Sequence, residues 1–191
     1  LVACADYVLS KTPGNTVSNM SSSRALRDVT VGHNGNYEAS AVGEVNVVEL
    51  MKKNNAVIGG EGNGGIIYPE LHYGRDSLVG VALFLTHLAN KKMSVSALRA
   101  SYPEYYMSKN KIELTPQIDV DAILTAMTDK YKNEDISTID GVKIDFASEW
   151  VHLRKSNTEP IIRIYTEAPS QEAADKLALR IIDEIKVIAG I

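Results

Sequence analysis

A cluster of side chains suited to binding phosphate lies in the segment RKSNTEP, residues 154–160. A guanidinium can bond two phosphate oxygens at once, and hydroxyl, amide and backbone N–H groups add neutral donors. In a chain of formal net charge -4, one concentrated site of this kind favours a small phosphate ester over a polyanion. A polar hairpin connection uses the same residue types, so the segment alone leaves both interpretations open. The candidate phosphate-binding residues are Arg154, Ser156, Asn157, Thr158 and Arg163, with Lys155 near them in sequence.

A second candidate site is the glycine-rich segment GGEGNGG, residues 59–65. Its glycines include the spacing G-x-G-x-x-G of dinucleotide-binding loops, which require a helix directly after the third glycine. Here the β-prone sequence IIYP follows, and its proline lacks a backbone donor. We therefore reject dinucleotide binding and predict a strand, a loop and a second strand, with Glu61 and Asn63 available to a ligand. A tight connection without a ligand is the alternative.

Other residues give weaker signals for chemistry. The histidines are scattered without the spacing of metal ligands, and we expect His87 to be packed or at the surface. His72 and Arg75 follow the glycine loop and could approach a substrate. The single cysteine, Cys4, excludes an internal disulfide and is expected to be buried, as is Trp150.

The composition is that of a globular protein, with 191 residues, 45% hydrophobic content and 23% charged content. The negative net charge gives no electrostatic signal for nucleic acid or an anionic membrane surface. The longest apolar stretch, residues 78–85, is too short to span a bilayer, and the N-terminus lacks the features of a signal peptide. We therefore expect a cytoplasmic protein. The first residues are already in a helical pattern, which suggests a piece of a longer polypeptide.

The first half of the chain alternates between helix and strand patterns. This alternation predicts an α/β domain with a mostly parallel sheet, in which the glycine loop lies at the carboxyl end of a strand. Pro103 marks the expected domain boundary. We expect helices at the N-terminus, through 24–26, from 45 to the KKNN segment, at 76–90 and at 94–100, and strands around 17, at 37–42 and at 56–60.

The second half has a different pattern. We expect a strand at 105–114, a helix at 118–131, three strands near 142–146, 149–153 and 161–166, and a final helix that begins at Ser170. Consecutive strands with short links pair antiparallel. The order β-α-β-β-β-α therefore predicts a small α+β domain with two helices on one face of an antiparallel sheet.

Together the two loops resemble the α-D-phosphohexomutase family, whose members interconvert sugar 1- and 6-phosphates. The segment RKSNTEPIIR contains R-x-S-[NG]-T-E-P and a following arginine, and GEGNGG is similar to the family's sugar-binding loop. With SAVGEVNV at residues 40–47, the phosphoglucosamine mutase branch is the most similar, and the phosphomannomutase/phosphoglucomutase branch is the alternative. The resemblance implies that residues 1–102 are the family's third, α/β domain and residues 103–191 its fourth, a TATA-box-binding-protein-like domain with an antiparallel sheet.

The resemblance also implies roles for individual residues. The first loop would read sugar hydroxyls through Glu61, Asn63 and Gly64, and the second loop would hold the phosphate that is not being transferred. Two departures leave the sugar contacts open. Gly65 stands where many members have histidine, and Ala41 stands where many have a basic residue. The phosphate loop corresponds to Arg154, Ser156, Asn157 and Thr158, followed by Arg163.

Two family motifs are missing from these residues, the phosphoserine loop T-A-S-H-N-P and the magnesium loop D-G-D-x-D-R. We therefore expect no catalytic or metal-binding residue here and no turnover from this chain alone. The N-terminal domains would supply the phosphoryl donor and Mg²⁺, a hexose bisphosphate would be the activator, and the partner would be a small-molecule phosphosugar. We expect neither nucleic acid nor a membrane as a partner. The rival hypothesis is a non-enzymatic module whose second half binds nucleic acid.

Overall fold

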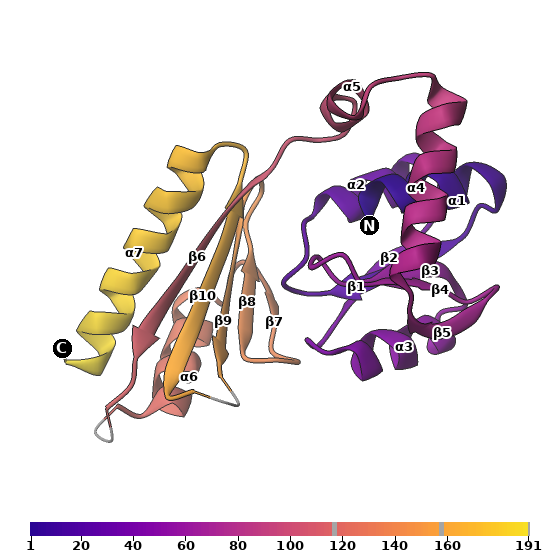
Figure 1. The fold of residues 1–191 in the computed structure, drawn as a ribbon. Coiled ribbons are helices and arrows are strands. Elements are labelled where there is room, and N and C mark those ends of the chain that lie inside the picture. Colours follow the sequence, from indigo (N-terminus) through magenta and orange to yellow (C-terminus); the bar gives the residue numbers. More distant parts are fainter. Residues whose placement is uncertain (116–117, 157–158, 191) are drawn as a thin grey trace. The chain divides into compact units, whose positions relative to one another are not determined.

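The computed structural model describes residues 1–115, 118–156 and 159–190 (Figure 1). The chain divides into two compact units, Leu1–Glu104 and Tyr105–Ile191, and each has its own hydrophobic core. In the part of the chain that the structure describes, no helix has both the length and the apolar character needed to cross a membrane.

The first unit contains a five-stranded sheet with the strand order β2-β1-β3-β4-β5. The strands β2, β1 and β3 are parallel, as predicted, and β4 and β5 extend the sheet as antiparallel strands. The predicted connection of strand, glycine loop and strand is confirmed between β3 and β4, whereas β5 was not predicted. The elements are α1 (Val2–Lys11), β1 (Asn15–Asn19), α2 (Ala25–Gly32), β2 (Tyr37–Ser40), α3 (Glu44–Lys53), β3 (Ala56–Gly60), β4 (Ile66–Tyr68), β5 (His72–Arg75), α4 (Ser77–Lys91) and α5 (Val95–Ala100).

Helices cover both faces of this sheet, because its central strands point apolar side chains to each side in turn (Figure 1). Ile58 and Ile66 pack with residues of α1 and α2, including Cys4, which is buried as expected. On the other face, Val17 and Ile67 pack against α3. This three-layer arrangement places the loops that follow β1 and β3 side by side at one edge of the sheet.

The second unit is an antiparallel sheet with the strand order β6-β10-β9-β8-β7. The predicted order β-α-β-β-β-α is wrong in one respect. A short strand, β7, precedes β8 and occupies the edge of the sheet; its three residues carry too little apolar pattern to predict it. The elements are β6 (Tyr106–Glu113), α6 (Val120–Lys130), β7 (Asp135–Ser137), β8 (Val142–Asp145), β9 (Trp150–Lys155), β10 (Ile161–Ala168) and α7 (Gln171–Ala189).

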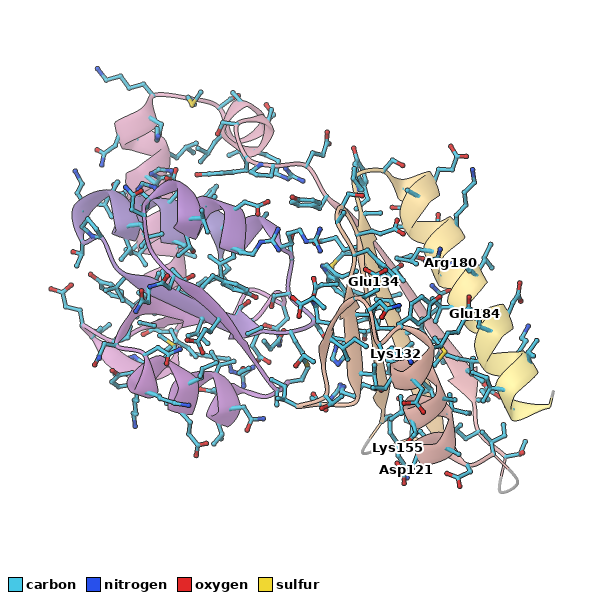
Figure 2. The ribbon with its side chains drawn as sticks, turned by 180° about the vertical axis from the view of Figure 1, so that it is seen from behind. Asp121, Lys132, Glu134, Lys155, Arg180 and Glu184 are labelled. Atoms are coloured by element: carbon cyan, nitrogen blue, oxygen red, sulfur yellow. The ribbon has the colours of Figure 1, made fainter. Side chains whose placement is uncertain are left out.

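The two helices of the second unit pack with one face of its sheet in a single core, as predicted. Figure 2 shows Arg180 and Glu184 on α7. Glu184 accepts a hydrogen bond from Tyr131 Oη at 2.9 Å and pairs with Lys130 of α6 at 3.0 Å, so polar contacts join the helices at the edge of the core. Arg154 and Arg163 lie on the opposite face of the sheet, because their sequence neighbours Leu153 and Ile162 point into the core.

Candidate functional site

The glycine loop is a compact turn at the carboxyl end of β3. Glu61 N donates to Gly65 O at 3.0 Å, and Gly64 N donates to Glu61 O at 3.1 Å. Gly60 has φ +153°, and a Cβ built there would overlap the carbonyl oxygen of Gly65. A side chain at this position is therefore excluded, and the loop backbone lies close to the edge of the sheet.

The Glu61 carboxylate is buried, at 5% exposure, and its orientation is fixed by residues that follow β1. Asn19 Nδ2 donates to Glu61 Oε1 at 2.8 Å, and Asn19 Oδ1 accepts from Ser22 Oγ at 2.8 Å. Ser22 Oγ in turn accepts from Gly62 N at 2.9 Å, which ties the turn after β1 to the glycine loop. The predicted sugar-reading carboxylate is thus held in one orientation.

A solvent-open recess of about 540 Å³ lies beside this loop. Asn63 and Gly64, two of the predicted sugar-binding residues, line it, whereas Glu61 is not in its lining and lies deeper in the loop. The recess contains one acid and one base, so its polar surface suits a hydroxylated ligand. Its lining consists of Glu44, Asn63, Gly64, Gly65, Arg75 and Ser77.

The two charged residues after the glycine loop have different positions. Arg75 lines the recess and binds Glu44, with Nε 2.7 Å from Oε2. Hydrogen bonds from the Arg75 backbone N–H and guanidinium lower the pKa of Glu44. His72 does not line the recess; its Nε2 lies 3.1 Å from Oδ2 of Asp76, the residue that caps α4. Of the pair, only Arg75 is placed to approach a ligand in the recess.

The segment from Arg154 to Arg163, here called the arginine loop, joins β9 to β10, and its two arginines lie on the sheet face opposite the helices. Arg154 and Arg163 are directly opposite each other across these strands, and Lys111 of β6 is opposite Arg163 on the other side. Like charges in opposite positions destabilise a sheet, and each of these cations has an acid near it. The separations are 3.8 Å for Arg154 and Asp140, 2.7 Å for Arg163 and Glu159, and 3.5 Å for Lys111 and Glu113.

The remaining predicted phosphate ligands belong to the loop itself. Ser156 is buried, and its N–H donates to Ile161 O at 3.0 Å, which closes the loop. Asn157 and Thr158 lie outside the described residues. Lys155 has the opposite orientation from Arg154, because successive residues of a strand point to opposite faces. In Figure 2 it lies on the side of the sheet that α6 covers.

The Asp140–Gly141 turn packs directly against the strand that carries Arg154. Gly141 has φ +74°, and a Cβ built there would overlap the carbonyl oxygen of Leu153. His152 Nε2 donates to Asp140 O at 2.6 Å, and His152 is buried. Burial lowers the pKa of His152, and the positive charge of Arg154 acts in the same direction. A neutral His152 thus fastens the turn whose Asp140 side chain faces Arg154.

The other singled-out side chains have structural partners. His87 is buried, which is the packed rather than the surface position of the two expected, and its Nε2 lies 3.0 Å from Asp6 Oδ2, which also accepts from Tyr102 Oη at 3.0 Å. Trp150 is buried, and its Nε1 donates to Glu167 at 2.8 Å. Among the described residues, no group of three or more His, Cys, Asp or Glu side chains is arranged to hold a metal ion.

Both units match domain models of one family. Residues 1–106 match the model of phosphoglucomutase/phosphomannomutase alpha/beta/alpha domain III, and residues 110–184 match that of the phosphoglucomutase/phosphomannomutase C-terminal domain. The chain therefore belongs to the phosphoglucomutase/phosphomannomutase family, the α-D-phosphohexomutases.

Individual relatives agree with this assignment. A phosphoglucosamine/phosphogalactosamine mutase of Sulfurisphaera tokodaii is 36% identical over 90% of this chain and 37% of its own length. A phosphoglucomutase/phosphomannomutase of Thermococcus kodakarensis is 34% identical over 94% of the chain and 40% of its own length. The structure of a family protein from Burkholderia thailandensis superposes with TM-score 0.80 at 22% identity, covering 98% of this chain and 41% of the other. The chain thus spans about two fifths of the length of these relatives.

Several residues around the two loops were not predicted from the sequence. Asn19 could have been found, because the carboxyl ends of adjacent parallel strands meet at one edge of the sheet. Lys111 and Asp140 become neighbours of the arginines only through the strand register, which spacing alone does not give. Glu44 is the first residue of α3, and its contact with Arg75 joins segments 31 positions apart.

Proposed function

We propose that this chain is the substrate-recognition half of a phosphohexomutase, which interconverts hexose 1-phosphate and hexose 6-phosphate through a bisphosphorylated sugar. The observation that carries the proposal is the placement of Arg154 and Arg163 directly opposite each other, next to the closed loop at Ser156. Two guanidinium groups on one sheet face form a donor surface that matches the several oxygens of a phosphate ester.

The two loops divide the recognition of one phosphosugar. The glycine loop, with Glu61, Asn63 and Gly64, reads hydroxyl groups, and the arginine loop binds the phosphate that is not being transferred. This chain offers no cluster of metal ligands among its described residues, so we assign it no step that involves Mg²⁺. The phosphoryl donor and the magnesium site belong to domains outside these residues, and a hexose bisphosphate is the activator.

Glucosamine phosphate is the substrate we propose. The relative from Sulfurisphaera tokodaii is named a phosphoglucosamine/phosphogalactosamine mutase, and one from Methanopyrus kandleri, 29% identical over 97% of this chain, a probable phosphoglucosamine mutase. The alternative is phosphomannomutase/phosphoglucomutase specificity, which is the name of the Thermococcus kodakarensis relative. Relative kcat/KM values of the complete enzyme for the phosphates of glucosamine, galactosamine, glucose and mannose would decide between these substrates.

The test of the phosphate site is substitution of Arg154. A compact ammonium cannot reproduce the two parallel bonds of a guanidinium, so Arg154→Lys should be nearly as damaging as Arg154→Ala. Loss of charge-assisted bonds should cost about 1.5 to 3 kcal/mol, or roughly one to two decades in affinity for a hexose phosphate. Isothermal titration of the chain would measure the affinity, and kcat/KM of the complete enzyme should fall in parallel.

The matched control is Lys155→Ala, which removes the adjacent cation from the opposite face of the sheet and should leave the affinity nearly unchanged. Thermal unfolding of each variant checks that it is folded. The chain by itself should show no mutase turnover with any hexose phosphate and a bisphosphate activator. A lysine variant at position 154 with the affinity of the wild type would show that the phosphate is held elsewhere.

A further inference from the structure

The side chain of Arg75 lies across the glycine loop at Gly65. A Cβ built at Gly65 would lie 2.7 Å from Cδ of Arg75, closer than carbon atoms can approach without a shift. Any residue other than glycine at position 65 must therefore displace the Arg75 stem. The missing side chain at Gly65 is thus what leaves room for a guanidinium in the recess that both residues line.

Glu44 fixes the direction of this guanidinium. One carboxylate oxygen accepts from the Arg75 backbone N–H at 3.0 Å, and the other accepts from Nε at 2.7 Å. A guanidinium has five N–H donors, and four of these are on its terminal nitrogens. Glu44 therefore holds the stem and Nε, and the terminal nitrogens extend beyond this contact.

The terminal nitrogen Nη1 of Arg75 points toward the buried carboxylate of Glu61, 3.7 Å from its Oε2. The Arg75 side chain is 49% exposed, whereas that of Glu61 is 7% exposed, so the pair joins the solvent side of the loop to its interior. A hydroxyl group both donates and accepts. A carboxylate and a guanidinium at this separation can therefore bind neighbouring hydroxyls, with the carboxylate as acceptor and the guanidinium as donor.

We propose that Arg75 is a substrate-contacting specificity residue, which donates from its terminal nitrogens to hydroxyl oxygens of the sugar ring, and that Gly65 is required to admit it. The inference rests on the proposed function, because it takes the ligand of the recess to be a phosphosugar. The competing interpretation is a purely structural ion pair that fastens β5 to α3 through Glu44.

Titration calorimetry with glucosamine 6-phosphate and with inorganic phosphate tests the proposal on the 191-residue chain. Arg75→Ala should weaken binding of the sugar phosphate about tenfold or more and leave binding of inorganic phosphate unchanged, since only the sugar carries hydroxyls. Arg75→Lys keeps the charge and the stem but loses the planar fork, and it should also weaken sugar phosphate binding. This second variant maintains the test if the alanine variant does not fold.

Gly65→Ala tests the role of the glycine. It should weaken sugar phosphate binding as Arg75→Ala does, and the double variant should bind no more weakly than either single variant, because both remove the same contact. The matched control is Gly74→Ala in the nearby strand β5, where an added Cβ would meet His72 Nδ1 at 3.1 Å rather than Arg75. The control should bind as the wild type does.

Folded Arg75 variants that bind the sugar phosphate like the wild type would overturn the proposal, and so would additive losses in the double variant. If the ion pair had only a structural role, the Arg75 variants would have a lower thermal midpoint and unchanged affinities for both ligands. Arg154→Ala separates this failure from failure of the proposed function. If Arg154→Ala abolishes binding of both ligands, the phosphate site is supported independently of the result for Arg75. If it changes neither affinity, the proposed function itself is refuted.

Discussion

Replacement of His152 should show how the second unit depends on a neutral, buried imidazole. His152→Gln keeps an N–H donor near the position of Nε2, whereas His152→Leu removes the donor to the Asp140 carbonyl, a bond of 2.6 Å. Losing a buried hydrogen-bond partner costs about 1 to 3 kcal/mol. For a domain of this size, each kcal/mol lowers the thermal midpoint by about 4 to 8 °C. We therefore expect clear destabilisation by leucine and a much smaller effect of glutamine.

The dependence of stability on pH follows from the same residue. Burial, together with the charges of Arg154 and Lys143, lowers the pKa of His152 below its ordinary value of 6.5, against the opposing effect of Asp140. The unfolded chain therefore binds the proton more tightly than the folded one. The stability contributed by neutral His152 is complete above pH 6.5 and is lost as the pH falls below it, by at most about 1.4 kcal/mol per pH unit.

The assay is urea unfolding followed by the fluorescence of Trp150, between pH 7.5 and pH 5. Trp150 is the single tryptophan of the chain and is buried in β9, so its signal reports on the second unit. The wild type should lose stability below pH 6.5, and His152→Gln should remove most of that slope. A wild type whose stability is constant over this range, or a glutamine variant with the same slope, would refute the reasoning.

Two further predictions concern backbone and charge. Gly141→Ala should destabilise the second unit by more than about 1 kcal/mol in the same fluorescence assay. The reason is that Gly141 has φ +74° and that the added carbon would overlap Leu153 O. An alanine variant as stable as the wild type would contradict this geometry. Burial raises the pKa of Asp6, but hydrogen bonds from His33 and Tyr102 outweigh it and lower the pKa below 3.8. Asp6→Asn should therefore lower the thermal midpoint of the first unit at pH 7, with the difference from the wild type shrinking as the pH falls through the Asp6 pKa.

Most helices and the main strands could be predicted because their sequences contain the signals that form them. Asp76 and Ser170 accept hydrogen bonds from the first-turn N–H groups of α4 and α7, as residues of their type do when they precede an apolar periodic segment. The sequences of β5, HYGR, and β7, DIS, are too short to show alternation. Both strands exist because a neighbouring strand pairs with them, which local sequence does not reveal.

The candidate site was predictable where one segment contains the chemistry and not where distant segments meet. Glu61 and Arg154 stand in recognisable loops, so their types and neighbours made them candidates. The contact of Arg75 with Glu44 depends on where β5 lies against α3, and Lys111 depends on the register of β6 with β10. Lys155 shows the converse, since it is adjacent to Arg154 in sequence but points to the opposite face of the strand.

The strand β6 is eight residues long and lies at the edge of the second sheet. A long edge strand offers a template for pairing with another chain, which is the first step of aggregation. Lysines on such a strand oppose this pairing, because it would desolvate them and bring like charges close together. Lys109 and Lys111 are both exposed on β6, and Lys109 Nζ lies over the ring of Tyr165, 5.3 Å from its centroid. Lys109 and Lys111 thus disfavour association of the molecule through this sheet edge.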